Sequence, residues 1–375
     1  MIIAEIGTSH EGSRQKALEL IHAAAEAGAD AVKFQWVYAD EILHPNTGFV
    51  SLPTGKIPLY ERFKQLEAGP AFFSAMQEEA RRLGMAFVCS PFGTRSLKEL
   101  HELKPDYIKI ASPELNHYPL LHELKNLNDG SHAEERIPVI LSSGVSSLAD
   151  IEKALAVTGT CNVTLLHCVT SYPAPPQEYN LRLIRNLAAI TGTECGVSDH
   201  SLDPVLVPAL SIAMGATMIE KHITLSRQTQ GLDDPVALEP EQFAQMVLAV
   251  RQAQAAVRHF SNGSKTPSLQ AQQYIITQMQ AQYGEELVQR TLGSGVKHLA
   301  QSERANYGRT NRSLHYMRPL IAGTRVSAAD IAVLRTEKEL SVGISPQYMQ
   351  TIIGKRICRN VQDGAGVQWE DFLTE

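Results

Sequence analysis

The sequence contains two short β-prone runs that each end in a histidine, Gly196-Val197-Ser198-Asp199-His200 and Met218-Ile219-Glu220-Lys221-His222. A helical pattern from Pro204 to Gly215 separates them, which predicts consecutive parallel strands of a β/α repeat. Adjacent parallel strands bring their C-terminal ends together, so His200 and His222 are expected to lie side by side. Two imidazoles there can share a divalent metal while water or substrate fills the open positions. For either histidine taken alone, a hydrogen-bonded barrel residue is the simpler interpretation.

The same alternation of strand and helix patterns continues through residues 1–260. Eight strands are predicted, at Ile2–Gly7, Ala31–Gln35, Ala86–Pro91, Tyr107–Ser112, Pro138–Ser143, Val163–Thr170, Glu194–His200 and Thr217–Thr224. Helical patterns accompany them at Arg14–Ala27, Ala71–Leu83, Leu148–Val157, Leu181–Ile190 and Glu239–Arg258. This count is that of an α/β fold of the (β/α)8 TIM-barrel type. An open doubly wound sheet is the alternative, but it usually has fewer strands and a glycine-rich phosphate turn that this sequence lacks.

The pattern changes after residue 260, and three regions are predicted. A barrel domain spans 1–260, a connecting segment with a Gln-rich helical pattern spans 261–305, and a small β-rich module spans 306–375. The module has short strands and turns at Arg312–Tyr316, Ile321–Val326 and Ile331–Arg335. One connection within the barrel, Trp36–Pro70, is too long for an ordinary β-to-α loop, which predicts a lid or substrate-selecting loop.

Composition excludes several classes of function. A formal net charge of −6 without a dense Lys/Arg run argues against a nucleic-acid surface. No apolar segment is long enough to span a bilayer, and residues 1–30 lack the features of a signal peptide. The five cysteines show no CxxC spacing, which suits reduced thiols. A cytoplasmic enzyme without nucleic-acid or membrane partners is therefore expected.

Polar residues are dense at the predicted C-terminal strand ends: Glu5, Lys33, Gln35, Ser90, Lys109, Ser112, Glu114, Ser142, Ser143, Thr170, Tyr172, Ser198, His200 and His222. Two lysines and several hydroxyls beside a metal can cradle a phosphate and a carboxylate. Glu5 and Glu114 are candidate acid/base groups. Singly, a strand-end serine often caps a helix, and a barrel lysine often pairs with a glutamate. Together they predict a barrel enzyme for a small anionic substrate.

These stretches resemble the sialic acid synthases, the phosphoenolpyruvate-condensing nonulosonate synthase family. The similar segments are Ile3–Gly12, Ala27–Gln35, Ser90–Phe92, Tyr107–Ser112, Leu141–Gly144, Leu166–Cys168 with Tyr172-Pro173, Gly196–His200 and Glu220–His222. The C-terminal module, through Arg312-Ser313-Leu314 and Ile352–Lys355, resembles the family's antifreeze-like (SAF) domain. The resemblance covers nearly the whole chain in the same order.

The resemblance implies a role for each site residue. His200 and His222 would hold a divalent metal, with Mn2+ preferred over Mg2+ or Co2+. Phosphoenolpyruvate would contact Lys33, Ser90, Lys109, Ser112, Ser142, Thr170 and Ser198. The sugar would contact Gln35, Tyr172, Asp233 and Arg335, and Glu5 and Glu114 would lie near the reacting centre. Arg335 would reach from the SAF domain of one subunit into the barrel of its partner, which implies a domain-swapped homodimer.

The implied reaction joins phosphoenolpyruvate to an N-acylated hexosamine, such as N-acetylmannosamine, and yields a sialic-acid-like nonulosonate and phosphate. Two alternatives are enzymes: a Schiff-base aldolase using Lys109, and a deoxy-sugar-acid synthase with another aldose acceptor, which the SAF-like module disfavours. A binding protein that has lost catalysis is a third. The chain departs from the family in Trp36–Pro70 and in the residues that follow Arg335, both on the acceptor side, so the sugar is left open.

Overall fold

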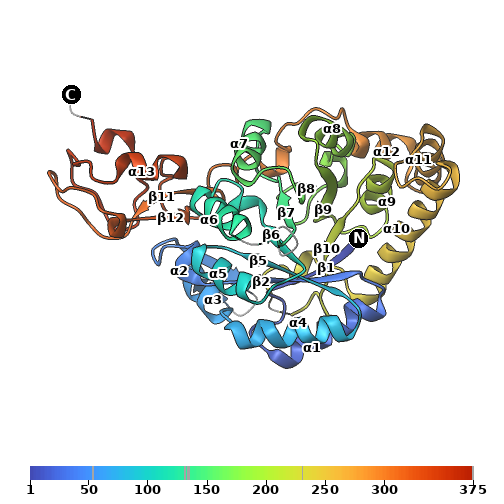
Figure 1. Cartoon of the computed structure of the whole chain (residues 1–375), viewed down its shortest axis with the longest axis horizontal. Coiled ribbons are helices and arrows are strands. Elements are labelled where there is room, and N and C mark those ends of the chain that lie inside the picture. Colours follow the sequence, from blue (N-terminus) through green and yellow to red (C-terminus); the bar gives the residue numbers. More distant parts are fainter. Residues whose placement is uncertain (53–54, 131, 133–135, 230, 374–375) are drawn as a thin grey trace.

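A closed parallel barrel forms the larger part of the molecule (Figure 1). The computed structural model describes residues 1–52, 55–130, 132, 136–229 and 231–373. Within them, neighbouring barrel strands follow the order β1-β10-β9-β8-β7-β6-β5-β2. The strands are β1 (Ile2–Gly7), β2 (Ala31–Trp36), β5 (Ala86–Pro91), β6 (Tyr107–Ile110), β7 (Val139–Ser142), β8 (Val163–Cys168), β9 (Glu194–Asp199) and β10 (Ile219–His222). Each of the eight predicted barrel strands is present, and the predicted TIM-barrel fold is confirmed.

Helices surround the barrel and bury their apolar faces against the outer side of the strands (Figure 1). They are α1 (Arg14–Glu26), α4 (Pro70–Arg82), α5 (Thr94–Glu102), α6 (Tyr118–Asp129), α7 (Leu148–Thr158), α8 (Arg182–Thr191), α9 (Leu206–Ala213) and α10 (Pro240–Phe260). Capping side chains mark the start of two of these helices. The Ser13 hydroxyl accepts a hydrogen bond from Lys16 N in the first turn of α1, and Ser147 forms a capping box with Asp150 in α7.

Strand alternation divides the barrel interior into layers. The lower layer is apolar and consists of Ile3, Ala31, Val88, Ile140, Leu166 and Met218. Residues two positions further along a strand point to the same side of the sheet, so the next layer toward the C-terminal ends holds Glu5, Lys33, Ser90, Ser142, Cys168 and Glu220. The lower layer fills the barrel, and the upper layer forms a polar floor at the carboxyl ends of the strands.

The long connection after β2 is structured. It contains α2 (Ala39–Ile42), the antiparallel pair β3 (Phe49–Leu52) and β4 (Gly55–Pro58), and α3 (Leu59–Gln65). Pro53 and Thr54, which follow β3 in the sequence, lie outside the described residues. The connection meets the C-terminal module, because Leu43 forms a bridge with Arg335 and Thr47 Oγ1 donates to Thr336 O at 3.1 Å. Its role as a lid stays a prediction.

Two helices occupy most of the predicted connecting segment 261–305. They are α11 (Leu269–Tyr283), which packs on α9 and α10, and α12 (Glu285–Leu292). The module that follows is set beside α2 and α6 at one end of the molecule (Figure 1) and has its own small core. It pairs β11 (Arg312–Tyr316) with β12 (Ile331–Arg335) and carries α13 (Met349–Ile352). Ile321–Val326 is a turn around Gly323, whose φ of +86° is incompatible with a strand.

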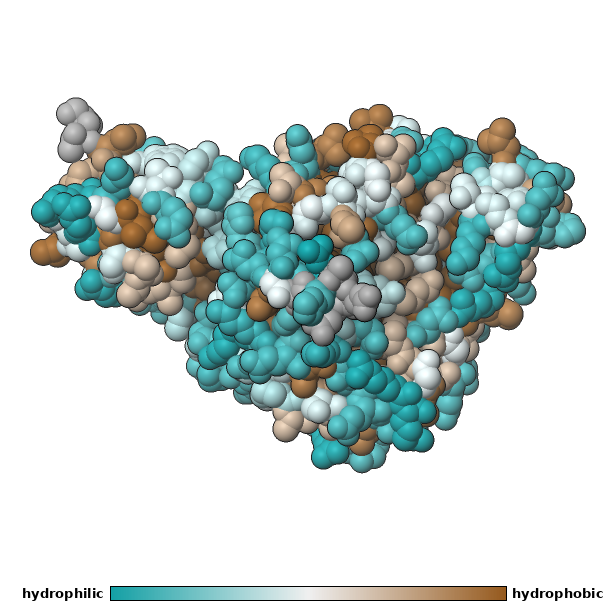
Figure 2. Space-filling model, viewed as in Figure 1, coloured by the Kyte–Doolittle hydropathy of each residue, from teal (hydrophilic) through white to brown (hydrophobic). Residues whose placement is uncertain are grey.

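The visible surface is mostly hydrophilic, with apolar residues scattered over the barrel helices and the module (Figure 2). Among the described residues, none of the helices combines the length and apolar character needed to cross a bilayer.

Candidate active site

A buried network of two lysines and two glutamates lies in the upper layer of the barrel. Lys109 Nζ is 2.6 Å from Glu220 Oε2, while Lys33 Nζ is 2.8 Å from Glu5 Oε1 and 3.8 Å from Glu220 Oε2. Ser198 Oγ donates to Glu220 Oε1 at 2.7 Å. Two cations therefore face two anions, and the network is internally balanced.

Burial and pairing act in opposite directions on these groups. Burial disfavours the charge of Lys33, but Glu220 and Glu5 together raise its pKa above the ordinary value. Burial likewise disfavours the Glu220 carboxylate, but Lys109 and Lys33 hold its pKa well below the usual range. Lys33 and Glu220 are therefore charged at neutral pH, and an arriving anion meets lysines that already have carboxylate partners.

The two strand-end histidines come together as predicted. Their ring centroids are 5.5 Å apart. His200 Nδ1 lies 2.9 Å from Val169 O, which makes Nδ1 the donor to that carbonyl, and Nε2 lies 3.3 Å from the Tyr172 hydroxyl. His222 Nδ1 is buried without a hydrogen-bond partner among the described residues, and Asp233 Oδ2 lies 4.0 Å away.

This arrangement fits a divalent metal held by two imidazoles. A metal-binding histidine ordinarily donates its other ring N–H to a carbonyl or carboxylate, as His200 does, and the unpaired His222 nitrogen needs a partner. The described residues contain no group of three or more histidine, cysteine or acidic side chains placed to hold a metal. Two protein ligands would leave the remaining positions open to water or substrate.

Hydroxyl groups line the neighbouring strand ends. Ser112 Oγ accepts from Gly144 N at 3.0 Å, and Ser142 Oγ is buried without a partner among the described residues. A Cβ at Gly144 would overlap Thr170 Oγ1 and lie 2.9 Å from Ser112 Oγ, so the cradle requires glycine there. Ser90 Oγ lies 3.5 Å from Lys33 Nζ. Hydroxyl donors beside ammonium groups are suited to binding a small oxyanion.

A second set of polar side chains lies beside the histidines. Gln35 Nε2 donates to Glu5 Oε1 at 2.8 Å, and the Tyr172 ring stacks on His200 with centroids 4.3 Å apart. Gly7 has a φ of +57°, and its lack of a side chain lets Gln35 and Asp233 approach the backbone. A Cβ there would lie 3.2 Å from Gln35 Nε2 and 3.6 Å from Asp233 Oδ2. Burial, followed by the charge of Glu5, raises the pKa of Asp233 to about 6.

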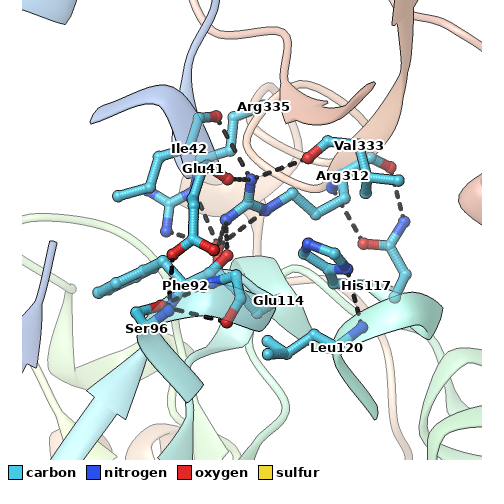
Figure 3. Close-up of polar contacts among 12 residues, drawn as sticks. Glu41, Ile42, Phe92, Ser96, Glu114, His117, Leu120, Arg312, Val333 and Arg335 are labelled. Atoms are coloured by element: carbon cyan, nitrogen blue, oxygen red, sulfur yellow. Dashed lines mark hydrogen bonds and ion pairs between the residues drawn. The ribbon is translucent and has the colours of Figure 1, made fainter. Parts of the chain in front are cut away.

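Glu114 meets the C-terminal module. Its Oε1 accepts from Arg312 Nε at 3.1 Å and from Arg335 Nε and Nη2 at 3.0 and 2.8 Å (Figure 3). Its Oε2 is buried without a partner among the described residues, and the acid/base role of Glu114 stays a prediction. Here Arg335 contacts Glu114 of its own barrel, and exchange of modules between subunits likewise stays a prediction.

Three residues of this region were not anticipated. Glu220 belongs to the same inward face as His222, two positions away, so strand alternation alone could have indicated it. Glu303 Oε2 accepts from Val145 N at 3.0 Å and Thr170 N at 2.9 Å and so holds two loops at the carboxyl ends of the strands. Glu303 and Arg312 act across long sequence separations, and no local pattern indicates them.

Fold and site together define a (β/α)8-barrel enzyme with a charged site at the carboxyl ends of its strands and a small β-rich module beside it. The model of the NeuB family matches residues 20–262, and that of the SAF domain matches residues 311–373. The chain belongs to the NeuB family, and the resemblance to the nonulosonate synthases is confirmed.

Relatives match over almost their whole length. The N,N'-diacetyllegionaminic acid synthase of Legionella pneumophila is 30% identical over 98% of this chain and 93% of that protein. The pseudaminic acid synthase of Campylobacter jejuni is 28% identical over 99% of this chain and 96% of that protein. The crystal structure of the spore coat polysaccharide biosynthesis protein SpsE from Bacillus subtilis has a TM-score of 0.79 at 29% identity and covers 100% of this chain and 95% of that one. The protein is thus an enzyme, a synthase of the NeuB family.

Proposed function

We propose that the protein condenses phosphoenolpyruvate with the open-chain aldehyde of an N-acylated hexosamine, such as N-acetylmannosamine, to give a nonulosonate and phosphate. The observation that carries the proposal is the placement of Lys33 and Lys109 in one buried network beside the pair His200 and His222. The similarity to legionaminic and pseudaminic acid synthases supports a sugar-derived acid as the product.

The lysines and hydroxyls would hold phosphoenolpyruvate. Lys33 and Lys109 would pair with its phosphate and carboxylate, and Ser142, whose hydroxyl is buried and unpaired, would donate to it. The other residues of this cradle would be Ser90, Ser112, Thr170 and Ser198. Because Glu5 and Glu220 already balance the lysines, substrate binding would redistribute these ion pairs.

The histidines would hold the divalent cation, with Mn2+ preferred. Bound there, such a cation supplies Lewis-acid polarisation of a carbonyl group. His200 is oriented for this by its bond to Val169 O. Gln35, Tyr172, Asp233 and Arg335 would position the sugar, and they lie around the same end of the barrel.

The reaction balances as one C–C bond formed and one C–O bond of the phosphate ester broken. C3 of phosphoenolpyruvate attacks the aldehyde carbon, and the aldehyde oxygen takes a proton to become a hydroxyl. Water adds to C2, and the tetrahedral carbon then expels phosphate and becomes the ketone. Glu5 Oε2 and Glu114 Oε2 are buried carboxylate oxygens without a partner among the described residues, so these two groups are the proposed acceptors of the water proton.

A Schiff-base aldolase is the second candidate, because burial lowers the pKa of Lys109. The pairing of its ammonium with Glu220 at 2.6 Å opposes the neutral amine that an imine requires. Borohydride reduction in the presence of pyruvate separates the two mechanisms, since only the aldolase traps a covalent adduct on Lys109.

The decisive experiment is a screen of N-acylated hexosamines with phosphoenolpyruvate and Mn2+, following phosphate and the 2-keto acid product together. We expect the two products in equal amounts with at least one acceptor, and neither product from a K33M/K109M double variant. Phosphate release without the keto acid, or no turnover with the hexosamine series, would overturn the proposal.

A further inference from the structure

Arg312, the first residue of β11, connects the module to three loops at the carboxyl ends of the barrel strands. Its Nη1 donates to Glu41 O at 2.6 Å and Val333 O at 3.2 Å, and its Nη2 donates to Phe92 O at 2.7 Å. Its Nε donates to Glu114 Oε1 at 3.1 Å (Figure 3). One buried guanidinium thus joins the connections after β2, β5 and β6 to β12.

Arg335 depends on the same partners. Its Nε and Nη2 bind the Glu114 oxygen that also accepts from Arg312, and its guanidinium carbon lies 5.3 Å from the centre of the Phe92 ring. Arg312 therefore holds both the Glu114 carboxylate and the backbone of Phe92, and these two residues orient Arg335. Arg335 itself is partly exposed, so its remaining donors can reach a ligand.

The long connection after β2 is held at the same place. Arg312 donates to the carbonyl of Glu41, and two residues later Leu43 bridges Arg335. Thr47 Oγ1 donates to Thr336 O, directly after Arg335. The long connection after β2 and the residues around Arg335 are thus in contact with one another, and Arg312 holds the connection at Glu41.

We propose that Arg312 is a positioning residue that couples docking of the module to assembly of the acceptor-sugar pocket, acting through Glu114 on Arg335. This inference rests on the proposed function. Its chemistry requires arginine, because a planar fork with five N–H donors can bind a carboxylate and several carbonyls at once. A lysine has a single charged nitrogen and cannot span them.

The test compares R312M and R312K in the full-length enzyme. The matched control is R325M, since Arg325 is an exposed arginine of the module that donates to a single carbonyl, that of Gly354. We expect R312M to raise the KM for the sugar about tenfold or more. The KM for phosphoenolpyruvate should stay within about twofold, with R312K intermediate and R325M unchanged. A role in folding alone would raise both KM values or lower only the amount of active enzyme.

A second comparison asks whether the effect passes through Arg335. Sugar affinity is measured by calorimetry in R335A and in R312M/R335A, with phosphoenolpyruvate present. We expect the R312M change to add less than about twofold once Arg335 is absent, because coupled residues are not additive. A full additional loss would overturn the coupling.

Hydrogen exchange separates this inference from the proposed function. We expect amides of residues 41–47 and 331–336 to exchange faster in R312M but not in R325M, whatever reaction the enzyme performs. Unchanged exchange there would refute the role of Arg312. If R312M exchanges faster at these amides but the wild-type protein shows no synthase activity, the proposed function alone is refuted.

Discussion

Replacing Lys109 by methionine separates the structural role of the buried charge network from its role in substrate binding. In the folded protein, Lys109 pairs with Glu220 at 2.6 Å, and both side chains are almost completely buried. Methionine keeps most of the side-chain length but leaves Glu220 with Lys33 as its nearest remaining cation, at 3.8 Å. Breaking a buried ion pair costs about 3–5 kcal/mol, and we expect the lower end because Lys33 remains.

The same change should weaken phosphoenolpyruvate binding. A charge-assisted contact to an anion contributes about 1.5–3 kcal/mol, which corresponds to a loss of roughly 10- to 150-fold in affinity. Adding E220Q removes the unpaired carboxylate, so K109M/E220Q should recover most of the stability. It should not recover the affinity, because the ammonium group is still missing.

Urea unfolding gives the free energy of unfolding of each variant, and calorimetric titration gives its affinity for phosphoenolpyruvate. K221M is the matched control, because Lys221 pairs with Asp199 at 2.7 Å on the neighbouring strand, equally buried but on the outer face of the barrel. K221M should lower stability and leave phosphoenolpyruvate affinity within about twofold. If K109M folds and keeps its affinity for phosphoenolpyruvate, Lys109 does not bind it.

Removing the proposed metal ligands should abolish turnover, and we expect H200A and H222A to keep the wild-type circular dichroism spectrum but lose activity. Full activity of the wild-type enzyme after exhaustive EDTA dialysis would refute the metal site. Burial lowers the pKa of His315 to about 4, so the folded state disfavours protonation of this side chain. The stability that the neutral His315 contributes is therefore complete above about pH 6.5 and is lost as the pH falls toward 4. This loss is about 3 kcal/mol at most, and the slope of unfolding free energy against pH should be smaller in H315Q. For assembly, in a homodimer with exchanged modules the same contacts of Arg312 and Arg335 would form between subunits, and mixed H200A and R335A subunits should then regain part of the activity. If subunits exchange and the mixture stays inactive, Arg335 acts on its own barrel.

The barrel and the centre of its site were predictable because both depend on the two-residue alternation of side chains along each β-strand. Every second residue of a barrel strand points inward, and parallel pairing places Glu5 opposite Lys33 on one side and His222 on the other. The histidine pair therefore followed from two strand ends. The segment Ile321–Val326 shows the opposite case, because its pattern indicates a short strand or a turn without deciding between them, and the positive φ of Gly323 belongs to a turn.

Contacts between the module and the barrel were less predictable, because no periodic pattern specifies them. In the sequence, Arg312 is part of a segment that resembles the SAF domain and carries no further signal. Its five acceptor groups come from Glu41, Ile42, Phe92, Glu114 and Val333. Four of these are main-chain carbonyls, which any residue supplies. Their convergence on one guanidinium depends on how two separately packed cores meet.

Charge balance explains why such a site would need both a metal and the module. Lys33 and Lys109 are matched by Glu5 and Glu220, so this network offers a multiply charged anion little net attraction. A divalent cation at the histidines would add two positive charges. Arg312 and Arg335 against Glu114 add one more, close to the same strand ends. We infer that the module contributes its positive charge mainly to the acceptor side of the site, where Arg335 lies beside Glu114.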